Sequence, residues 1–169
     1  MRALTSTFAA AALLVSTAGQ SFAAAPPCMR PAEKAAFDIA GLKSELMVVA
    51  IDCQAQSKFN AFVGRFRPDL IGSENGLNSY FKRTARGSAE RAHDDYITSL
   101  ANAQSDNAVS RGTLFCGEHI DMFDKVMALK DSRDLLTYAA GEKLVQPIAL
   151  VECQAPQAPA KKVKTVSAQ

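Results

Sequence analysis

The sequence predicts an all-α fold: a bundle of five or six helices stapled by disulfide bonds, with a disordered C-terminal tail. Apolar residues recur at spacings of three and four along most of the chain, which is the period of a helix with one buried face. The absence of tryptophan and the abundance of alanine suit helices better than a β-sandwich. An even number of cysteines, four, predicts two disulfides. No two of them have the close spacing of a zinc site, so neither a metal nor a cofactor is expected.

The first 23 residues have the pattern of a secretory signal peptide. A basic start at Arg2 precedes an apolar run over residues 8–15 and a small-x-small sequence at residues 21–23. Cleavage after Ala25 would leave Pro26 as the first mature residue, so cleavage after Ala23 is expected. The apolar run is shorter than the roughly 20 residues that span a bilayer, and no later segment qualifies. We therefore expect an exported, periplasmic protein without a transmembrane segment.

The mature chain has the length of a single domain. We expect one helical domain over residues 24–153. Residues 154–169 consist largely of Ala, Pro, Lys and Gln, which bury too little apolar surface to fold, so this tail is predicted to be disordered.

The first predicted helix covers residues 31–53 and is expected to lie at the centre of the bundle. Pro31 and Glu33 suit its first turn, and its C-terminal half is apolar nearly all round. The second helix presents Phe59, Phe62 and Phe66 on one face and ends before a proline. This aromatic face is expected in the core, although it could also line a ligand pocket.

A third predicted helix begins as early as Asp69, and a fourth follows Ser88, its expected N-cap. The fourth fades in the polar run 104–110, and a fifth covers residues 115–129. A short sixth helix, capped by Asp131 or Ser132, ends at Gly141. Residues 144–151 are apolar and contain a proline, so they are expected to run extended across the bundle.

The direction of the helices bears on the disulfide pairing. A first helix of about 20 residues is roughly 30 Å long, whereas bridged Cα atoms lie within about 7 Å, so Cys28 and Cys53 should not pair. If consecutive helices alternate in direction, the favoured pairs are Cys28–Cys116 and Cys53–Cys153. The nested pairing, Cys53–Cys116 with Cys28–Cys153, is the alternative.

Two histidines are candidates for catalysis or metal binding. His93 has only Glu90 one turn away as a carboxylate, and its acidic surroundings favour a solvated helix start. His119 lies near Glu118 and Asp121, a pattern more typical of a salt-bridged helix surface than of an acid–base pair. No Gly-x-Ser-x-Gly motif is present, and no catalytic residue is expected.

A basic cluster is the remaining candidate for a binding surface. The formal net charge is +2, which gives no strong overall field and argues against nucleic acid as a partner. Positive side chains nevertheless gather in the middle of the chain, with two of them one helical turn apart and aromatic residues just before them. The candidate binding residues are Arg65, Arg67, Lys82, Arg83 and Arg86. An ordinary solvated face is the alternative.

Together these patterns favour a non-catalytic binding protein of the cell envelope, an inhibitor or adaptor. Its partner would be an exported protein, such as an envelope enzyme, or an anionic cell-wall component contacted through the basic cluster. One alternative is a small exported hydrolase or metal-dependent enzyme that uses His93 or His119. Another is a small-ligand carrier with a pocket between the first and second helices. The sequence leaves the oligomeric state open.

Overall fold

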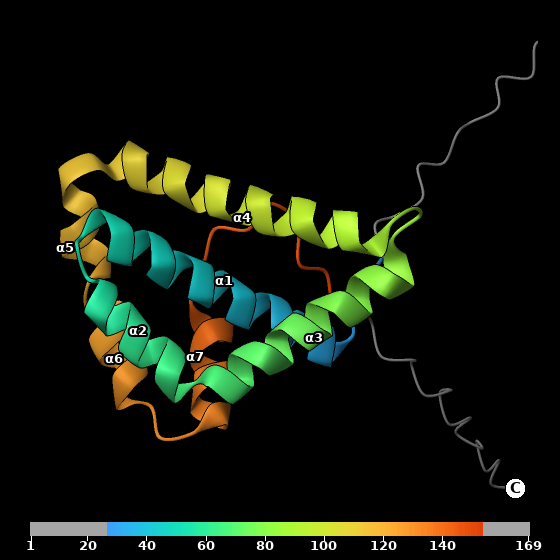
Figure 1. The fold of residues 1–169 in the computed structure, drawn as a ribbon, viewed down its shortest axis with the longest axis horizontal. Coiled ribbons are helices and arrows are strands. Elements are labelled where there is room, and N and C mark those ends of the chain that lie inside the picture. The colour runs from blue at the N-terminus through green and yellow to red at the C-terminus, as the bar shows by residue number, and fades with distance from the viewer. Residues whose placement is uncertain (1–26, 154–169) are drawn as a thin grey trace, which may run out of the picture.

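A computed structural model describes residues 27–153; the predicted signal peptide and C-terminal tail lie outside the described residues. The described part is an all-α bundle stapled by two disulfides, as predicted (Figure 1). Its helices are α1 (Pro31–Asp52), α2 (Gln56–Arg65), α3 (Arg67–Thr84), α4 (Ala89–Arg111), α5 (Phe115–His119), α6 (Met122–Ala128) and α7 (Ser132–Gly141), with a 3₁₀ turn at Gly112–Leu114. Within residues 27–153, the only β pairing is an isolated parallel bridge between Met29 and Glu152. None of the helices in this range combines the length and apolar character needed to cross a membrane.

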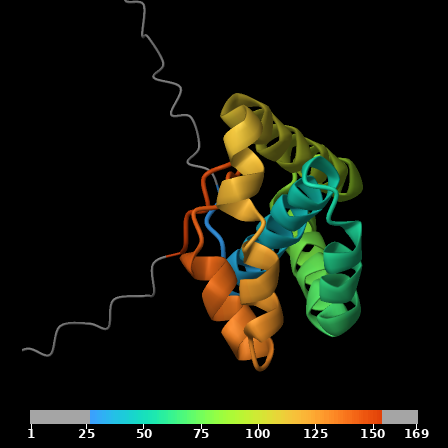
Figure 2. The same cartoon turned by 90° about the vertical axis from the view of Figure 1, so that its left-hand side faces the viewer.

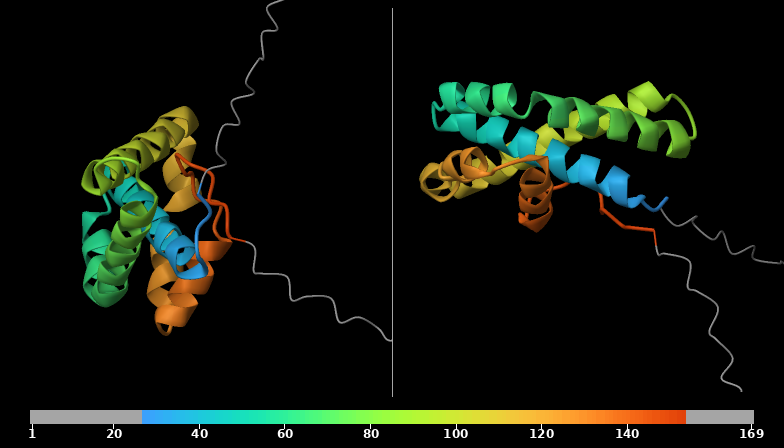
Figure 3. Two further views of the ribbon diagram at one scale, coloured as in Figure 1. Left: turned by 90° about the vertical axis from the view of Figure 1, so that its right-hand side faces the viewer. Right: turned by 90° about the horizontal axis from the view of Figure 1, so that it is seen from below.

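Helix α1 lies at the centre of the bundle, as predicted. It is flanked by α2 and α3 on one side and by the C-terminal part of the chain on the other (Figure 3). Phe37, Leu42, Leu46 and Val49 are completely buried along its length. Because apolar residues face several directions, α1 can pack against most of the other helices at once.

Helices α2 and α3 run in the same general direction, and both return alongside α1 (Figure 1). Only Phe66 separates them, and Pro68 occupies the first turn of α3. Proline is compatible with a first turn because the N–H that it lacks has no partner there. The break before Pro68 therefore bends the chain without reversing it.

The favoured disulfide pairing is wrong for this reason. Since α2 and α3 together make one return path, α4 runs parallel to α1 and brings Cys116 to the C-terminal end of α1. Cys53 pairs with Cys116 at a Cα–Cα distance of 5.5 Å, and Cys28 pairs with Cys153 at 4.8 Å. This is the nested alternative, and all four cysteines are oxidised.

Helix α4 is longer than predicted and continues through the polar run 104–110 to Arg111. Gln104 is completely buried there, and its amide donates to the carbonyls of Gly41 and Val145 at 3.0 and 3.2 Å. Gln104 thus bonds to the backbone of its neighbours, whereas Ser105, Asp106 and Ser110 of the run are exposed. Ser88 caps α4 by accepting from the backbone N–H of Arg91, as predicted.

The chain after α4 is more broken than predicted, because residues 115–129 form two short helices, α5 and α6. Asp131 caps α7, and the helix ends at Gly141, both as predicted. The C-terminal segment, residues 142–153, then runs without helix beside the N-terminal residues (Figure 2). It is fastened by Gln146, which donates to the Phe37 carbonyl and accepts from the Tyr96 hydroxyl.

Candidate binding cleft

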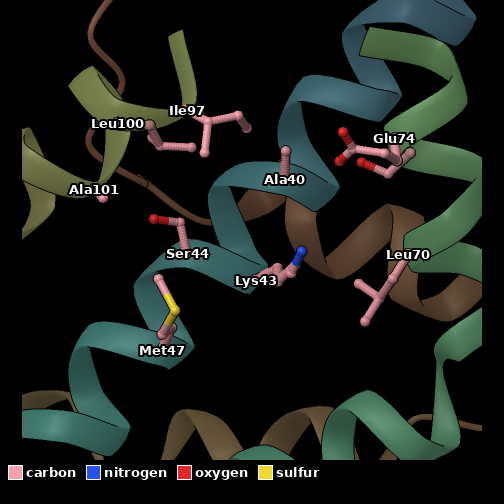
Figure 4. Close-up of a pocket in the computed structure, with 10 residues that line it drawn as sticks. Ala40, Lys43, Ser44, Met47, Leu70, Glu74, Ile97, Leu100 and Ala101 are labelled. Atoms are coloured by element: carbon pink, nitrogen blue, oxygen red, sulfur yellow. The ribbon is translucent and has the colours of Figure 1, made fainter. Parts of the chain in front are cut away.

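Helices α3 and α4 leave their connecting turn and diverge across α1 (Figure 1). Ser73 donates to the Ala36 carbonyl at 2.7 Å and so holds α3 against α1. Between the three helices lies an open cleft of about 110 Å³ (Figure 4). Its floor and walls are made by Ala40, Lys43, Ser44 and Met47 of α1, Leu70, Ser73 and Glu74 of α3, and Ile97, Leu100 and Ala101 of α4.

The cleft is mainly apolar, and two of its large apolar side chains are exposed to solvent. Met47 and Ile97 are each 37% exposed. Ser44, on the floor, is 9% exposed, and its hydroxyl has no hydrogen-bond partner. Figure 4 shows this hydroxyl directed toward α4. A buried hydroxyl without a partner costs about 1–3 kcal/mol of folding stability, so the unpaired Ser44 hydroxyl destabilises the fold.

Charged side chains border the cleft on the α3 side. Lys43 and Glu74 both line it (Figure 4). His93 lies against Glu74, with Nε2 2.9 Å from Oε1, and its ring meets Phe81 edge-on at 5.8 Å. The prediction of a solvated helix start at His93 is wrong, because its side chain is only 12% exposed between α3 and α4.

The second histidine, His119 of α5, lies against α1 in another part of the bundle. His119 Nε2 lies 3.7 Å from Glu45 Oε1, and Nδ1 lies 3.1 Å from the Phe115 carbonyl oxygen. Glu45 is buried, and its Oε2 has no hydrogen-bond partner. Burial raises the pKa of Glu45, and the nearby charge of His119 partly opposes this rise. A cavity of about 60 Å³ adjoins the pair and is bordered by residues 142–145 of the C-terminal segment.

The sequence had associated His119 with Glu118 and Asp121. The favoured interpretation of these carboxylates as a salt-bridged helix surface is confirmed, because Glu118 pairs with Arg111 and Asp121 pairs with Lys125 at 2.9 Å. Glu45 was missed because it lies on another helix, and no local spacing connects it to the histidine.

Two members of the basic cluster, although exposed, bond to other parts of the fold. Arg65 donates to the carbonyls of Met127 and Leu129, and its guanidinium lies over the Phe66 ring at 5.1 Å. Arg83 pairs with Glu33, which lowers the pKa of that carboxyl. Arg65 thus connects α2 to the end of α6, and Arg83 connects α3 to α1.

The cluster is also divided along α3. Arg65 and Arg67 lie at its N-terminal end, while Lys82, Arg83 and Arg86 lie at its C-terminal end. A helix of 18 residues separates the two groups by about 25 Å. All five members are exposed, but because of this separation they do not share one compact surface.

The aromatic face of α2 contributes to the core. Phe62 is completely buried and Phe66 is 4% exposed, so the open cleft lies against α3 and α4, away from α2. Ser79 and Lys82 have the Ser-x-x-Lys spacing found in some acyl enzymes, a feature that the sequence reasoning overlooked. Both are exposed and lie outside the cleft, and the Ser79 hydroxyl donates to the Asn75 carbonyl at 2.8 Å.

Among residues 27–153, no group of three or more His, Cys, Asp or Glu side chains is placed to hold a metal ion. No family model matches the chain, and no curated protein or solved structure compared with it is significantly similar. Two disulfides indicate an oxidising environment outside the cytoplasm.

Proposed function

We propose that the protein is a non-catalytic binding protein, exported to the periplasm by a signal peptide that is cleaved after Ala23. Its binding site is the cleft between α1, α3 and α4, which receives one apolar side chain of an exported protein partner. The observation that carries this proposal is an open, mainly apolar cleft of about 110 Å³ whose floor holds a buried hydroxyl without a hydrogen-bond partner. Through such a contact the protein would act as an inhibitor or adaptor of an envelope enzyme.

The size of the cleft favours a protein partner over a carried ligand. Pockets that enclose small-molecule ligands usually measure about 300–1,000 Å³, several times the volume of this cleft. A cleft of this size instead suits one anchoring side chain, and such anchors supply much of the binding energy in protein interfaces. A bundle stapled by two disulfides presents the cleft with little loss of conformational entropy on binding.

The exposed basic residues have a secondary role in this proposal. Lys82 and Arg86 lie beyond the cleft toward the α3–α4 turn. Charges at the rim of an interface mainly accelerate association and add little affinity. Reversing both charges should therefore slow binding at low salt, whereas blocking the cleft should abolish it.

A peptide-display selection on the oxidised protein tests the proposal. The enriched peptides should share one large apolar residue. Ala101→Trp fills the cleft and should abolish their binding, whereas Ala103→Trp, two residues along α4 and outside the cleft, should preserve it. Ile97→Ala removes part of one wall and should weaken binding about tenfold, and thermal unfolding verifies that each variant is folded.

Two results would overturn the proposal. One is binding of the enriched peptides to Ala101→Trp as strongly as to the unmodified protein. The other is binding that withstands Ala101→Trp but disappears on the double substitution Lys82→Glu with Arg86→Glu. The second result would return the site to the basic cluster.

A further inference from the structure

We infer that the side chain received by the cleft is a tyrosine of the partner protein. This inference rests on the proposed function and adds the chemical identity of the anchor. It follows from the polar group on the floor of the cleft, from the sulfur beside it and from the apolar walls around both.

The Ser44 hydroxyl requires an occupant that can form a hydrogen bond. It lies on the floor of an apolar cleft, is shielded from solvent and has no partner. Nearby Ser73 shows the contrasting arrangement, because its hydroxyl donates to the Ala36 carbonyl. A purely apolar occupant would leave Ser44 unpaired, whereas a phenol hydroxyl can donate to Ser44 Oγ or accept from it.

Met47 supplies a sulfur atom that can contact an aromatic ring in the cleft. It lies one turn beyond Lys43 on the floor, and its thioether is visible beside Ser44 in Figure 4. Methionine sulfur interacts favourably with aromatic rings, and its unbranched side chain can rotate to admit one. Met47 is 37% exposed, so this rotation requires no change in the core.

Most of the remaining lining disfavours a charged anchor. Leu70, Ile97 and Leu100 supply apolar walls on both sides, whereas the charged residues Lys43 and Glu74 border the cleft on the α3 side. Leucine and phenylalanine would fill the same walls but leave the Ser44 hydroxyl unpaired. Sites that bond a substrate hydroxyl reject the analogue that lacks it, so tyrosine should be preferred over phenylalanine.

Two small probes distinguish the anchors: 4-methylphenol has the shape of a tyrosine side chain, and toluene has that of phenylalanine. Their affinities can be measured by titration against the methyl NMR signals of Ile97 and Leu100. We expect 4-methylphenol to bind about tenfold more tightly than toluene. Ser44→Ala should reduce this preference to less than twofold and leave toluene binding unchanged. The control Ser79→Ala, exposed and outside the cleft, should leave both affinities unchanged.

The outcomes separate this inference from the proposed function. Equal binding of the two probes to the unmodified protein, with both lost in Ala101→Trp, would overturn the tyrosine anchor and leave the cleft as the binding site. A preference for 4-methylphenol that persists in Ser44→Ala would also overturn it. If neither probe shifts the cleft signals and the selected peptides still bind Ala101→Trp, the proposed function itself fails.

Discussion

Helix α1 has two flanks that are built differently: a closed flank, which faces the C-terminal segment, and an open flank, which lies between α3 and α4. On the flank that faces the C-terminal segment, Gln104 donates to the Gly41 carbonyl and Gln146 donates to the Phe37 carbonyl. The Cys28–Cys153 disulfide fastens the end of the same segment. On the flank between α3 and α4, the Ser44 hydroxyl is unpaired, and Met47 remains in contact with solvent.

The difference lies in what surrounds the unpaired polar atoms of each flank. On the flank that faces the C-terminal segment, Gln104 Oε1 and Glu45 Oε2 are also unpaired, but Gln104 bonds to that segment through its amide nitrogen and Glu45 lies against His119. The unpaired Ser44 hydroxyl instead lines an open, mainly apolar cleft, where it destabilises the fold. Unsatisfied groups in such places concentrate at functional sites, so the open flank is the more informative one.

Removing the Cys28–Cys153 disulfide should have the largest effect and should act on the closed flank. The bridge joins residues separated by 125 positions, and the chain-entropy model assigns such a loop about 4–5 kcal/mol. The double variant Cys28→Ser with Cys153→Ser should lose about this much in denaturant unfolding. Peptide binding by the fraction that remains folded should be unchanged. Loss of binding before unfolding would show that the two flanks are coupled.

A smaller effect is expected where α3 approaches α1 beside the cleft. A Cβ atom added at Gly76 would lie 2.5 Å from the Cβ of Ala36, so Gly76→Ala forces the helices apart and should cost about 2 kcal/mol. Gly72, one turn earlier on α3, faces open space. Gly72→Ala should therefore stabilise α3 by about 0.5–1 kcal/mol. Equal effects of the two substitutions on thermal unfolding would contradict this close packing.

The smallest effect depends on pH and again belongs to the closed flank. Burial raises the pKa of Glu45 above its ordinary value of 4.5, so the folded state holds this proton more tightly than the unfolded chain. The resulting stabilisation is complete below pH 4.5 and is lost as pH rises through the raised pKa. Each unit of that rise corresponds to about 1.4 kcal/mol.

The side chain of the variant Glu45→Gln does not ionise, so this variant does not lose stability as the pH rises through the pKa of Glu45. Its stability relative to the unmodified protein should therefore increase with pH. Glu118 is the matched control, because its pairing with Arg111 lowers its pKa. Glu118→Gln should give a small trend of opposite sign. Denaturant unfolding at several pH values measures both trends, and parallel trends for the two variants would contradict the assignment.

Features set by neighbouring residues could be predicted from the sequence. The caps at Ser88 and Asp131 and the end of α7 at Gly141 follow from local side-chain chemistry. The disulfide pairing could not be decided in this way. A proline at position 68 indicates a break, but it does not indicate whether the chain turns back, and the direction of α4 depends on that.

The candidate site could not be predicted in the same way, because it depends on contacts between helices. Such contacts leave no pattern among neighbouring residues of the sequence. His93 meets Glu74, and His119 meets Glu45, across helix interfaces. In the sequence, Arg65 and Arg83 resembled surface charges, because the carbonyls and the carboxylate to which they donate belong to residues far away in the chain. The aromatic face of α2 was assigned correctly to the core, because helical spacing predicts one buried face, and Phe62 and Phe66 are buried.

The central claim is that binding occurs on the open flank of α1. Methyl NMR of the protein with and without a selected peptide tests it most directly, because each flank has its own methyl groups. The account predicts large shifts at Met47, Ile97 and Leu100 of the cleft, with little change at Leu144 and Leu150 of the C-terminal segment. Shifts confined to that segment, with the cleft signals unchanged, would contradict it.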